Sequence, residues 1–194
     1  MRELILREVV EAHRNRYARA YRRRFGSDPP GRRVRRIVLV RLEEDEEGAS
    51  RLYKLLGARG AVVAEWRPER EEDAAPVTPV HAWFVGLSSP PTGVASHRVR
   101  TAVARALATR AFVAIAPEAL AFVAEGGELR GRRVSFPLDE EAALSGGAGL
   151  VRADGPVSRD RNLLTCLGRE RLGDLVRGLL DLVHATSPEG VTER

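Results

Sequence analysis

Cysteine, lysine and aromatic residues are scarce in this chain of 194 residues. The single cysteine, Cys166, excludes an internal disulfide and a metal cluster built on cysteines. A chain without disulfides is typical of a reducing compartment, so we expect a cytoplasmic location. Lys54 is the only lysine, so the basic character of the chain depends on arginine.

Long hydrophobic runs are also missing. The longest apolar stretches have the length of a strand, far below the ~20 residues that span a membrane, so we expect no membrane span. The opening residues 1–16 mix acidic and basic side chains and lack the apolar core and cleavage site of a secretory signal.

Motifs for nucleotides and metals are lacking too. The sequence contains no P-loop and no dinucleotide fingerprint, so we expect no cofactor. The four histidines fall on four different predicted elements, and none has a second ligand at helical spacing. We therefore expect no metal site at His13, His81, His97 or His184.

The remaining composition, 43% hydrophobic and 30% charged, is typical of a soluble domain with an appendage. The net charge of +5 is unevenly distributed. Residues 1–36 hold twelve arginines and four acids, a local charge of +8, which leaves −3 for residues 37–194. The basic character therefore belongs to the N-terminal segment.

Residues 3–25 form a predicted amphipathic helix, because apolar residues recur at spacings of three and four. The stripe is predicted to pack on the domain or on a second subunit, most simply in a homodimer. The arginines of the other face could also bind nucleic acid or a membrane surface. They are Arg14, Arg16, Arg19, Arg22, Arg23 and Arg24. We assign residues 1–31 to this helix and its turn-rich linker.

Residues 32–185 are predicted to form an α/β domain, followed by a flexible tail at residues 186–194. Apolar strands are expected at residues 34–42, 61–66, 80–86 and 112–115, with helices between them. This alternation predicts a mainly parallel sheet sandwiched by helices, as in flavodoxin-like folds. In the second half we expect a short helix at residues 138–144 and strands at 150–152 and 162–166 in a hairpin. A last helix is expected at residues 169–184.

Residues 111–131 contain the most informative stretch. They predict a buried strand, a sharp turn at Ala116–Pro117 and a helix that begins at Glu118. Strand, tight turn and helix is the arrangement that exposes a catalytic nucleophile, yet this turn has no Ser, Cys or Thr. Because ligands bind at the C-terminal ends of parallel strands, residues 43–47, 87–93 and 116–119 should surround one mouth.

These elements together resemble the ThiJ/PfpI family of the class I glutamine amidotransferase-like fold. The run GELRGRRVSFP (residues 127–137) is similar to a family segment that has glycine, R/K-G-R/K-K-V-T and a later proline, although Glu128 departs from that pattern. The run RDRNLLTCLG (residues 159–168) is similar to the family's D-G-N-L-I-T-S-R-G strand. IVLV, LLGARGAVV and WFVG follow in family order, so the resemblance covers about residues 34–184.

The resemblance implies a nucleophilic cysteine at the elbow, but Ala116 or Pro117 stands there, and neither can attack a carbonyl. The family's helper histidine maps to Glu118 (or Pro117) or to Phe136. Its oxyanion glycines fall near residues 87–89, and its first-loop glutamate falls near residues 46–48. The pocket candidates are therefore Glu46, Ser88, Ser89, Pro117, Glu118 and Phe136.

Each candidate also has a structural interpretation. Glu118 caps a helix N-terminus or serves as a base, and the acids at residues 43–47 stabilise a helix start or line the pocket. His97 is solvent-exposed or pairs with Ser88 or Ser89. Cys166 is expected to be a small buried side chain away from the elbow.

Three functions follow from these candidates. The first is a catalytically degenerate ThiJ/PfpI-like protein that acts through binding or assembly, as a homodimer with room for a small-molecule ligand. The second is a hydrolase or lyase-like enzyme with chemistry other than that of a cysteine in the same pocket. The third is a nucleic-acid-binding or regulatory protein that uses the N-terminal helix.

Overall fold

The computed structural model describes residues 35–42, 52–57, 61–70, 75, 80–87, 89–109 and 111–185. The predicted N-terminal helix with its six arginines, the candidates Glu46 and Ser88, and the predicted tail lie outside the described residues. No helix in the described ranges is long and apolar enough to cross a membrane.

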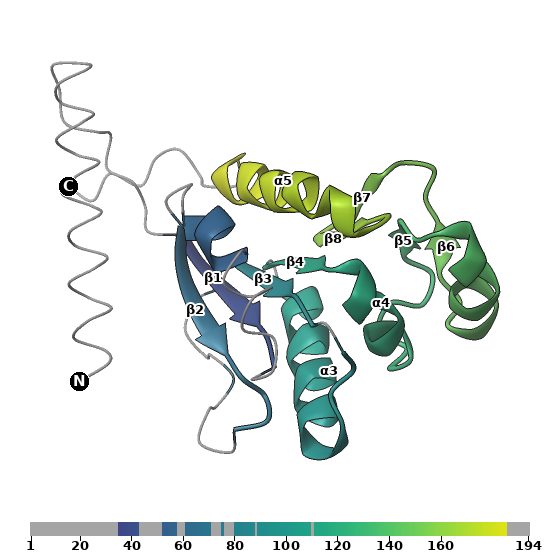
Figure 1. Ribbon diagram of the computed structural model, residues 1–194, viewed down its shortest axis with the longest axis horizontal. Coiled ribbons are helices and arrows are strands. Elements are labelled where there is room, and N and C mark those ends of the chain that lie inside the picture. The colour runs from purple at the N-terminus through teal and green to yellow at the C-terminus, as the bar shows by residue number, and fades with distance from the viewer. Residues whose placement is uncertain are drawn as a thin grey trace, which may run out of the picture. The chain divides into compact units, whose positions relative to one another are not determined.

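A six-stranded sheet forms the centre of the domain (Figure 1). Its strands are β1 (Arg35–Val40), β2 (Ala61–Trp66), β3 (Ala82–Val85), β4 (Phe112–Ile115), β7 (Val157–Asp160) and β8 (Leu163–Cys166). Their order is β2-β1-β3-β4-β8-β7, and every neighbouring pair is parallel except β7 with β8. The mainly parallel α/β sheet predicted from the sequence is confirmed.

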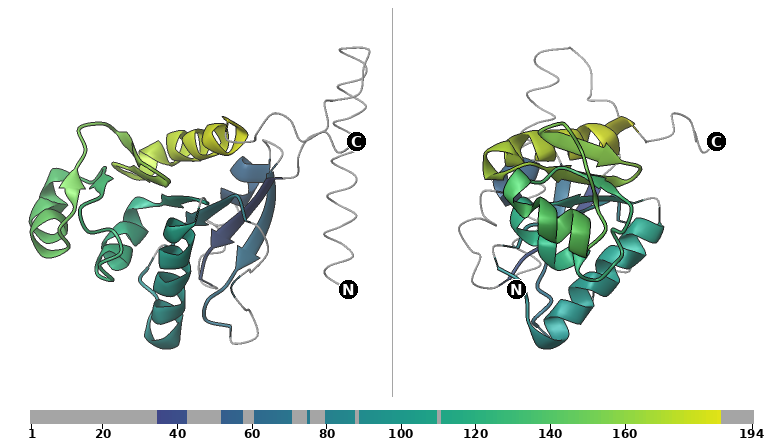
Figure 2. Two further views of the ribbon diagram at one scale, coloured as in Figure 1. Left: turned by 180° about the vertical axis from the view of Figure 1, so that it is seen from behind. Right: turned by 90° about the vertical axis from the view of Figure 1, so that its right-hand side faces the viewer.

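Helices cover both faces of this sheet, with α3 (Gly93–Ala108) on one side and α5 (Leu172–Ala185) on the other (Figures 1 and 2). The turn Arg169–Arg171 (η3) leads into α5. On the α3 side, Val99 and Val103 pack with Val85 and Ile115 in one core. The second core is built by side chains of α5 and of the helical residues 52–57, namely Leu52, Leu56, Leu175 and Leu179, packed on Ile37, Leu39 and Ala114.

Burial on both faces explains the sequence of the central strands. All four residues of β3, β4 and β8 are buried, so the strands read as continuous apolar runs rather than alternating ones. Helix α5 instead buries one stripe, Leu175, Val176, Leu179, Leu180 and Val183, at helical spacing.

The chain between β4 and β7 is grouped around α4 (Pro117–Ala124), away from β1 and β2 (Figure 2). Strand β5 (Arg133–Val134) pairs in parallel with β6 (Val151–Arg152). Between them lie a 3-10 turn, η1 (Leu138–Glu140), and a π-helical segment, η2 (Ala142–Gly147). The α-helix predicted at residues 138–144 is thus replaced by a 3-10 turn, which is wound more tightly than an α-helix, and a π-helical segment, which is wound more widely. The π-helical segment includes Gly146 and Gly147.

The predicted hairpin was assigned to the wrong partners. Residues 151–152 pair with β5, and the antiparallel partner of β8 is β7, which lies within the stretch that we had expected to be a connection. β7 was missed because its sequence, VSRD, is polar and only partly buried at the edge of the sheet. Its tight turn, Arg161–Asn162, places Arg161 at φ 56°, in the left-handed region.

Candidate functional site

The C-terminal ends of the parallel strands meet at one edge of the sheet. Ile115 pairs with Val85 of β3 and with Thr165 of β8, so Ala116 lies between Gly86 and Cys166. The Ala116 N–H donates to the Val85 carbonyl at 2.9 Å and extends this ladder by one residue. A β-carbon at Gly86 would lie 2.9 Å from Leu52 Cδ1, so glycine leaves room here for the end of the Leu52 side chain.

The elbow predicted between β4 and α4 is present. Ala116 is the N-cap of α4 in an extended conformation (φ −64°, ψ 151°), and Pro117 is the first helical residue. Proline suits this position because its missing N–H has no partner in the first turn of a helix. Ala116 is 3% exposed, and neither residue carries a nucleophile, so the turn contributes shape and no reactive group.

Glu118 follows in the first turn of α4, where the helix dipole favours a carboxylate. Its Oε1 accepts a hydrogen bond from Arg169 Nε, which reaches it from the turn after β8. The Glu118 side chain is half-buried and the arginine is exposed. The Glu118 carboxylate is therefore partly accessible to solvent at the C-terminal ends of the strands, where it forms an ion pair with Arg169.

Glu140 adds a second carboxylate to this region. Partial burial raises the pKa of Glu140, and the negative charges of Asp139 and Glu118 raise it further. Glu118 and Glu140, although 22 positions apart in the chain, therefore interact through space. Two carboxylates in different environments can divide the roles of acid and base.

Cys166 lies beside the elbow, which corrects the expectation that it is remote from it. It follows Thr165 at the end of β8, next to Ala116, and both residues belong to the core on the α5 side. The thiol is fully buried and donates to the Gly168 carbonyl at 3.5 Å. Burial, together with the charges of Glu118 and Glu170, raises the pKa of Cys166 to about 12. The side chain is therefore a neutral, packed thiol.

Two other predicted candidates lie in different surroundings. The Phe136 ring is 1% exposed and packs in the core on the α3 side. Ser89 is half-buried in the turn between β3 and α3. His97, its proposed partner, is exposed on α3 with Nε2 3.5 Å from Thr101 Oγ1 of the same helix. The structure thus brings Glu118 near Glu140 and near Cys166, and it places the His97 ring against its own helix.

Arg41, which sequence reasoning missed, is a buried charge at the same edge. It follows β1 and is 6% exposed, and among the described residues it is the one charged side chain in the core. Its Nε donates to Glu65 Oε2 at 3.0 Å, and Arg67 Nη2 approaches the same oxygen at 3.5 Å. The sequence could have indicated this buried charge, because Arg41 directly follows the apolar run of β1. In the described ranges, no three or more His, Cys, Asp or Glu side chains are grouped to hold a metal ion.

Comparison with known proteins gives a clear result at the level of structure alone. No family model and no curated protein matches the sequence significantly. Among solved structures, a ThiJ/PfpI domain protein from Brachyspira murdochii aligns with a TM-score of 0.61 at 12% identity, over 80% of this chain and 100% of that one.

Two DJ-1 proteins are similarly related in structure. A DJ-1 superfamily protein from Salmonella typhimurium, solved as a cysteine-to-alanine mutant, aligns at 18% identity with a TM-score of 0.57, over 78% of this chain and 91% of that one. DJ-1beta of Drosophila melanogaster aligns at 15% identity with a TM-score of 0.55, over 81% and 92%. At such low identities, these alignments establish a shared fold.

Proposed function

Because the chain has the fold of the ThiJ/PfpI and DJ-1 proteins, we propose that it is a divergent member of the ThiJ/PfpI family that acts through binding or assembly rather than through a catalytic thiol. The observation that carries this proposal is the elbow itself. The strand, turn and helix are intact, but Ala116 and Pro117 stand where the family resemblance implies the nucleophile.

Cys166 does not replace the missing nucleophile. The reactive form of cysteine is the thiolate, and a thiol with a pKa of about 12 is ionised in roughly one molecule in 10⁵ at pH 7. The sulfur is also fully buried, so a substrate carbonyl has no access to it in the folded state.

The mode of action that we propose is assembly as a homodimer in the cytoplasm, with a small molecule at the strand edge as a further ligand. Sedimentation equilibrium of the full chain tests the assembly. We expect a mass of about twice 21.3 kDa at micromolar concentration. A chain that remains monomeric to millimolar concentration would exclude the homodimer.

Catalytic degeneracy is tested separately by assaying ester, amide and small aldehyde substrates with the wild type, Cys166→Ser and Glu118→Gln. We expect no saturable turnover from any of the three proteins. Turnover that Cys166→Ser abolishes would refute the proposal, because the buried thiol would then be the nucleophile.

A second candidate function is an enzyme with carboxylate chemistry, which the interaction of Glu118 with Glu140 favours. Burial and the nearby negative charges raise the pKa of Glu140, which favours the protonated form that a general acid requires. In the same assays this function requires saturable turnover that Glu118→Gln and Glu140→Gln remove and Cys166→Ser leaves unchanged.

A further inference from the structure

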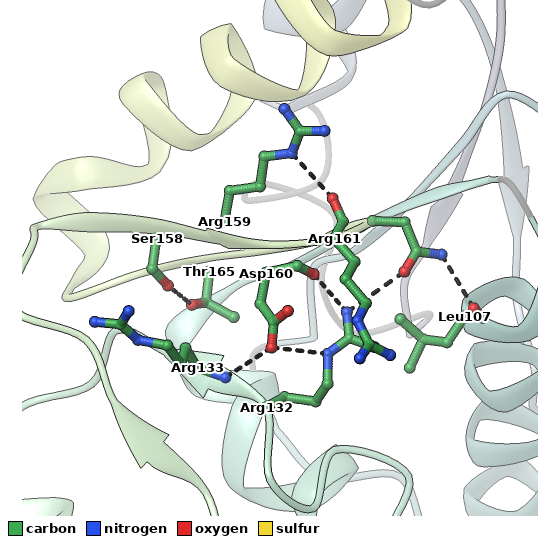
Figure 3. Close-up of polar contacts among 9 residues, drawn as sticks. Leu107, Arg132, Arg133, Ser158, Arg159, Asp160, Arg161 and Thr165 are labelled. Carbon is green, nitrogen blue, oxygen red and sulfur yellow. Dashed lines mark hydrogen bonds and ion pairs between the residues drawn. The ribbon is translucent and has the colours of Figure 1, made fainter.

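The end of the sheet opposite to the elbow, where the parallel strands begin, is rich in arginine. The β7–β8 turn lies at this end, where β8 begins, and β5 starts beside it. Four arginines lie around the β7–β8 turn and the start of β5, and we call them the hairpin arginine cluster: Arg132, Arg133, Arg159 and Arg161 (Figure 3). The carboxylates Glu118 and Glu140 lie at the other end of the strands, where Arg169 forms an ion pair with Glu118.

Asp160 neutralises one member of the cluster. Arg132 Nε lies 3.1 Å from Asp160 Oδ2, and both side chains are largely buried. The same oxygen accepts the backbone N–H of Arg133 at 2.9 Å, and the Arg133 side chain is exposed. Within the described residues, Asp160 is the one carboxylate in contact with the cluster, so three guanidinium charges are not paired there.

Two contacts hold the Arg159 guanidinium in place. Arg159 Nε donates to the Arg161 carbonyl at 2.9 Å, and its guanidinium lies 5.8 Å from the centre of the Phe112 ring. Figure 3 shows the Arg133 guanidinium pointing away from Asp160. Groups that are already ordered lose less conformational entropy when they bind a ligand.

Arg161 is notable because of its backbone. Its φ of 56° is a conformation that disfavours side chains with a β-carbon by about 1–2 kcal/mol. The family pattern that residues 159–168 resemble has glycine at this position. This chain instead carries a positive charge at the tip of the turn, in a conformation that is costly for arginine.

We propose that the hairpin arginine cluster binds the phosphate backbone of nucleic acid. Guanidinium groups match the paired oxygens of phosphate, and a duplex presents a phosphate every ~3.4 Å along each strand, so neighbouring arginines can engage it at once. The contact is electrostatic and independent of base sequence. It lies on the folded domain and is distinct from the N-terminal arginines considered above.

The test measures fluorescence anisotropy of a labelled DNA duplex of about 20 base pairs with the full chain, over a series of salt concentrations. We expect the double variant Arg133→Gln/Arg161→Gln to bind at least tenfold more weakly. The slope of log K against log salt should fall by about 2, since each lost phosphate contact accounts for ~0.9. Neither side chain makes a hydrogen bond or ion pair with another residue that the structure describes, and both backbone hydrogen bonds remain, so the fold should be unchanged.

The matched control is Arg171→Gln/Arg177→Gln, which removes the same charge beside Asp174 near the start of α5. This variant should bind within twofold of the wild type. Three results would each overturn the proposal. They are no salt-sensitive binding by the wild type, equal losses in the hairpin and control variants, or a loss confined to the variant Arg22→Gln/Arg23→Gln.

Discussion

Asn162 joins three separate segments of the fold, and its removal is the most direct test of how the second half of the chain is held. Its Nδ2 group donates to the carbonyls of Leu107, Thr109 and Ala111 at 3.1, 3.2 and 2.9 Å. Its Oδ1 accepts from Arg132 Nη2 at 3.4 Å. One amide thus connects the end of α3, the residue before β4 and the residue before β5.

The magnitude for Asn162→Ala follows from these bonds. An amide has two N–H donors, so it serves two of the three carbonyls at a time. The Thr109 carbonyl is at an exposed site and can bind water, whereas the bonds to Leu107 and Ala111 are partly buried. Leaving each of those two without a partner costs about 1–2 kcal/mol, so we expect a loss of about 2–4 kcal/mol.

Chemical and thermal unfolding followed by circular dichroism measure this loss. For a domain of this size, about 2–4 kcal/mol lowers the Tm by roughly 4–15 °C. Asn162→Asp should be at least as destabilising, because it replaces the donors with an acceptor that faces three carbonyls. Ser158→Ala, which removes one hydroxyl contact with Thr165 at 2.8 Å, should cost about 1 kcal/mol. An Asn162→Ala protein that melts within 1 °C of the wild type would refute the reasoning.

Two further predictions concern the hairpin turn and the buried thiol. Arg161→Gly should raise the Tm by ~1–3 °C. Removing the β-carbon relieves the strain of the left-handed backbone, and this gain exceeds the cost of the added chain entropy by roughly 0.5–1 kcal/mol. Arg161→Ala retains the β-carbon and should leave the Tm unchanged. Equal melting of the two variants would argue against backbone strain at this turn. Cys166 should not react with Ellman's reagent until the protein unfolds. Because its folded pKa is about 12 and an unfolded thiol ionises near ~8.5, stability should fall as the pH rises between these values. Cys166→Ala should make the free energy of unfolding less dependent on pH in this range. An unchanged dependence on pH would contradict the raised pKa of the buried thiol.

The middle of the sheet was predictable because strands β3, β4 and β8 are buried on both faces. The strands at residues 61–66 and 112–115 were predicted to the residue from apolar runs bounded by glycine, alanine and proline. The resemblance to the ThiJ/PfpI proteins, drawn from the order and spacing of short motifs, was confirmed at the level of the fold. Strand β7 gave no such signal, since its residues are polar and its identity as a strand depends on pairing with β8.

The candidate site was less predictable because it depends on strand order. The sequence places Cys166 fifty positions after Ala116, and only the pairing of β4 with β8 makes the two residues neighbours. The approach of Glu140 to Glu118 has the same origin, since η1 returns to the start of α4 after a long excursion. The elbow was predictable because all of its parts are consecutive in the chain. The candidates Glu46 and Ser88, outside the described residues, remain predictions.

The position of β8 has a consequence for folding during synthesis. Strand β4 pairs with β8 on one side, but 48 positions separate Ile115 from Leu163. At about 5–20 residues per second, a ribosome needs roughly 2–10 s to add this stretch. During that interval the apolar edge of β4 has no β-strand on that side. The nascent chain therefore presents an open template for strand pairing, which the arrival of β8 and its turn residue Asn162 finally closes.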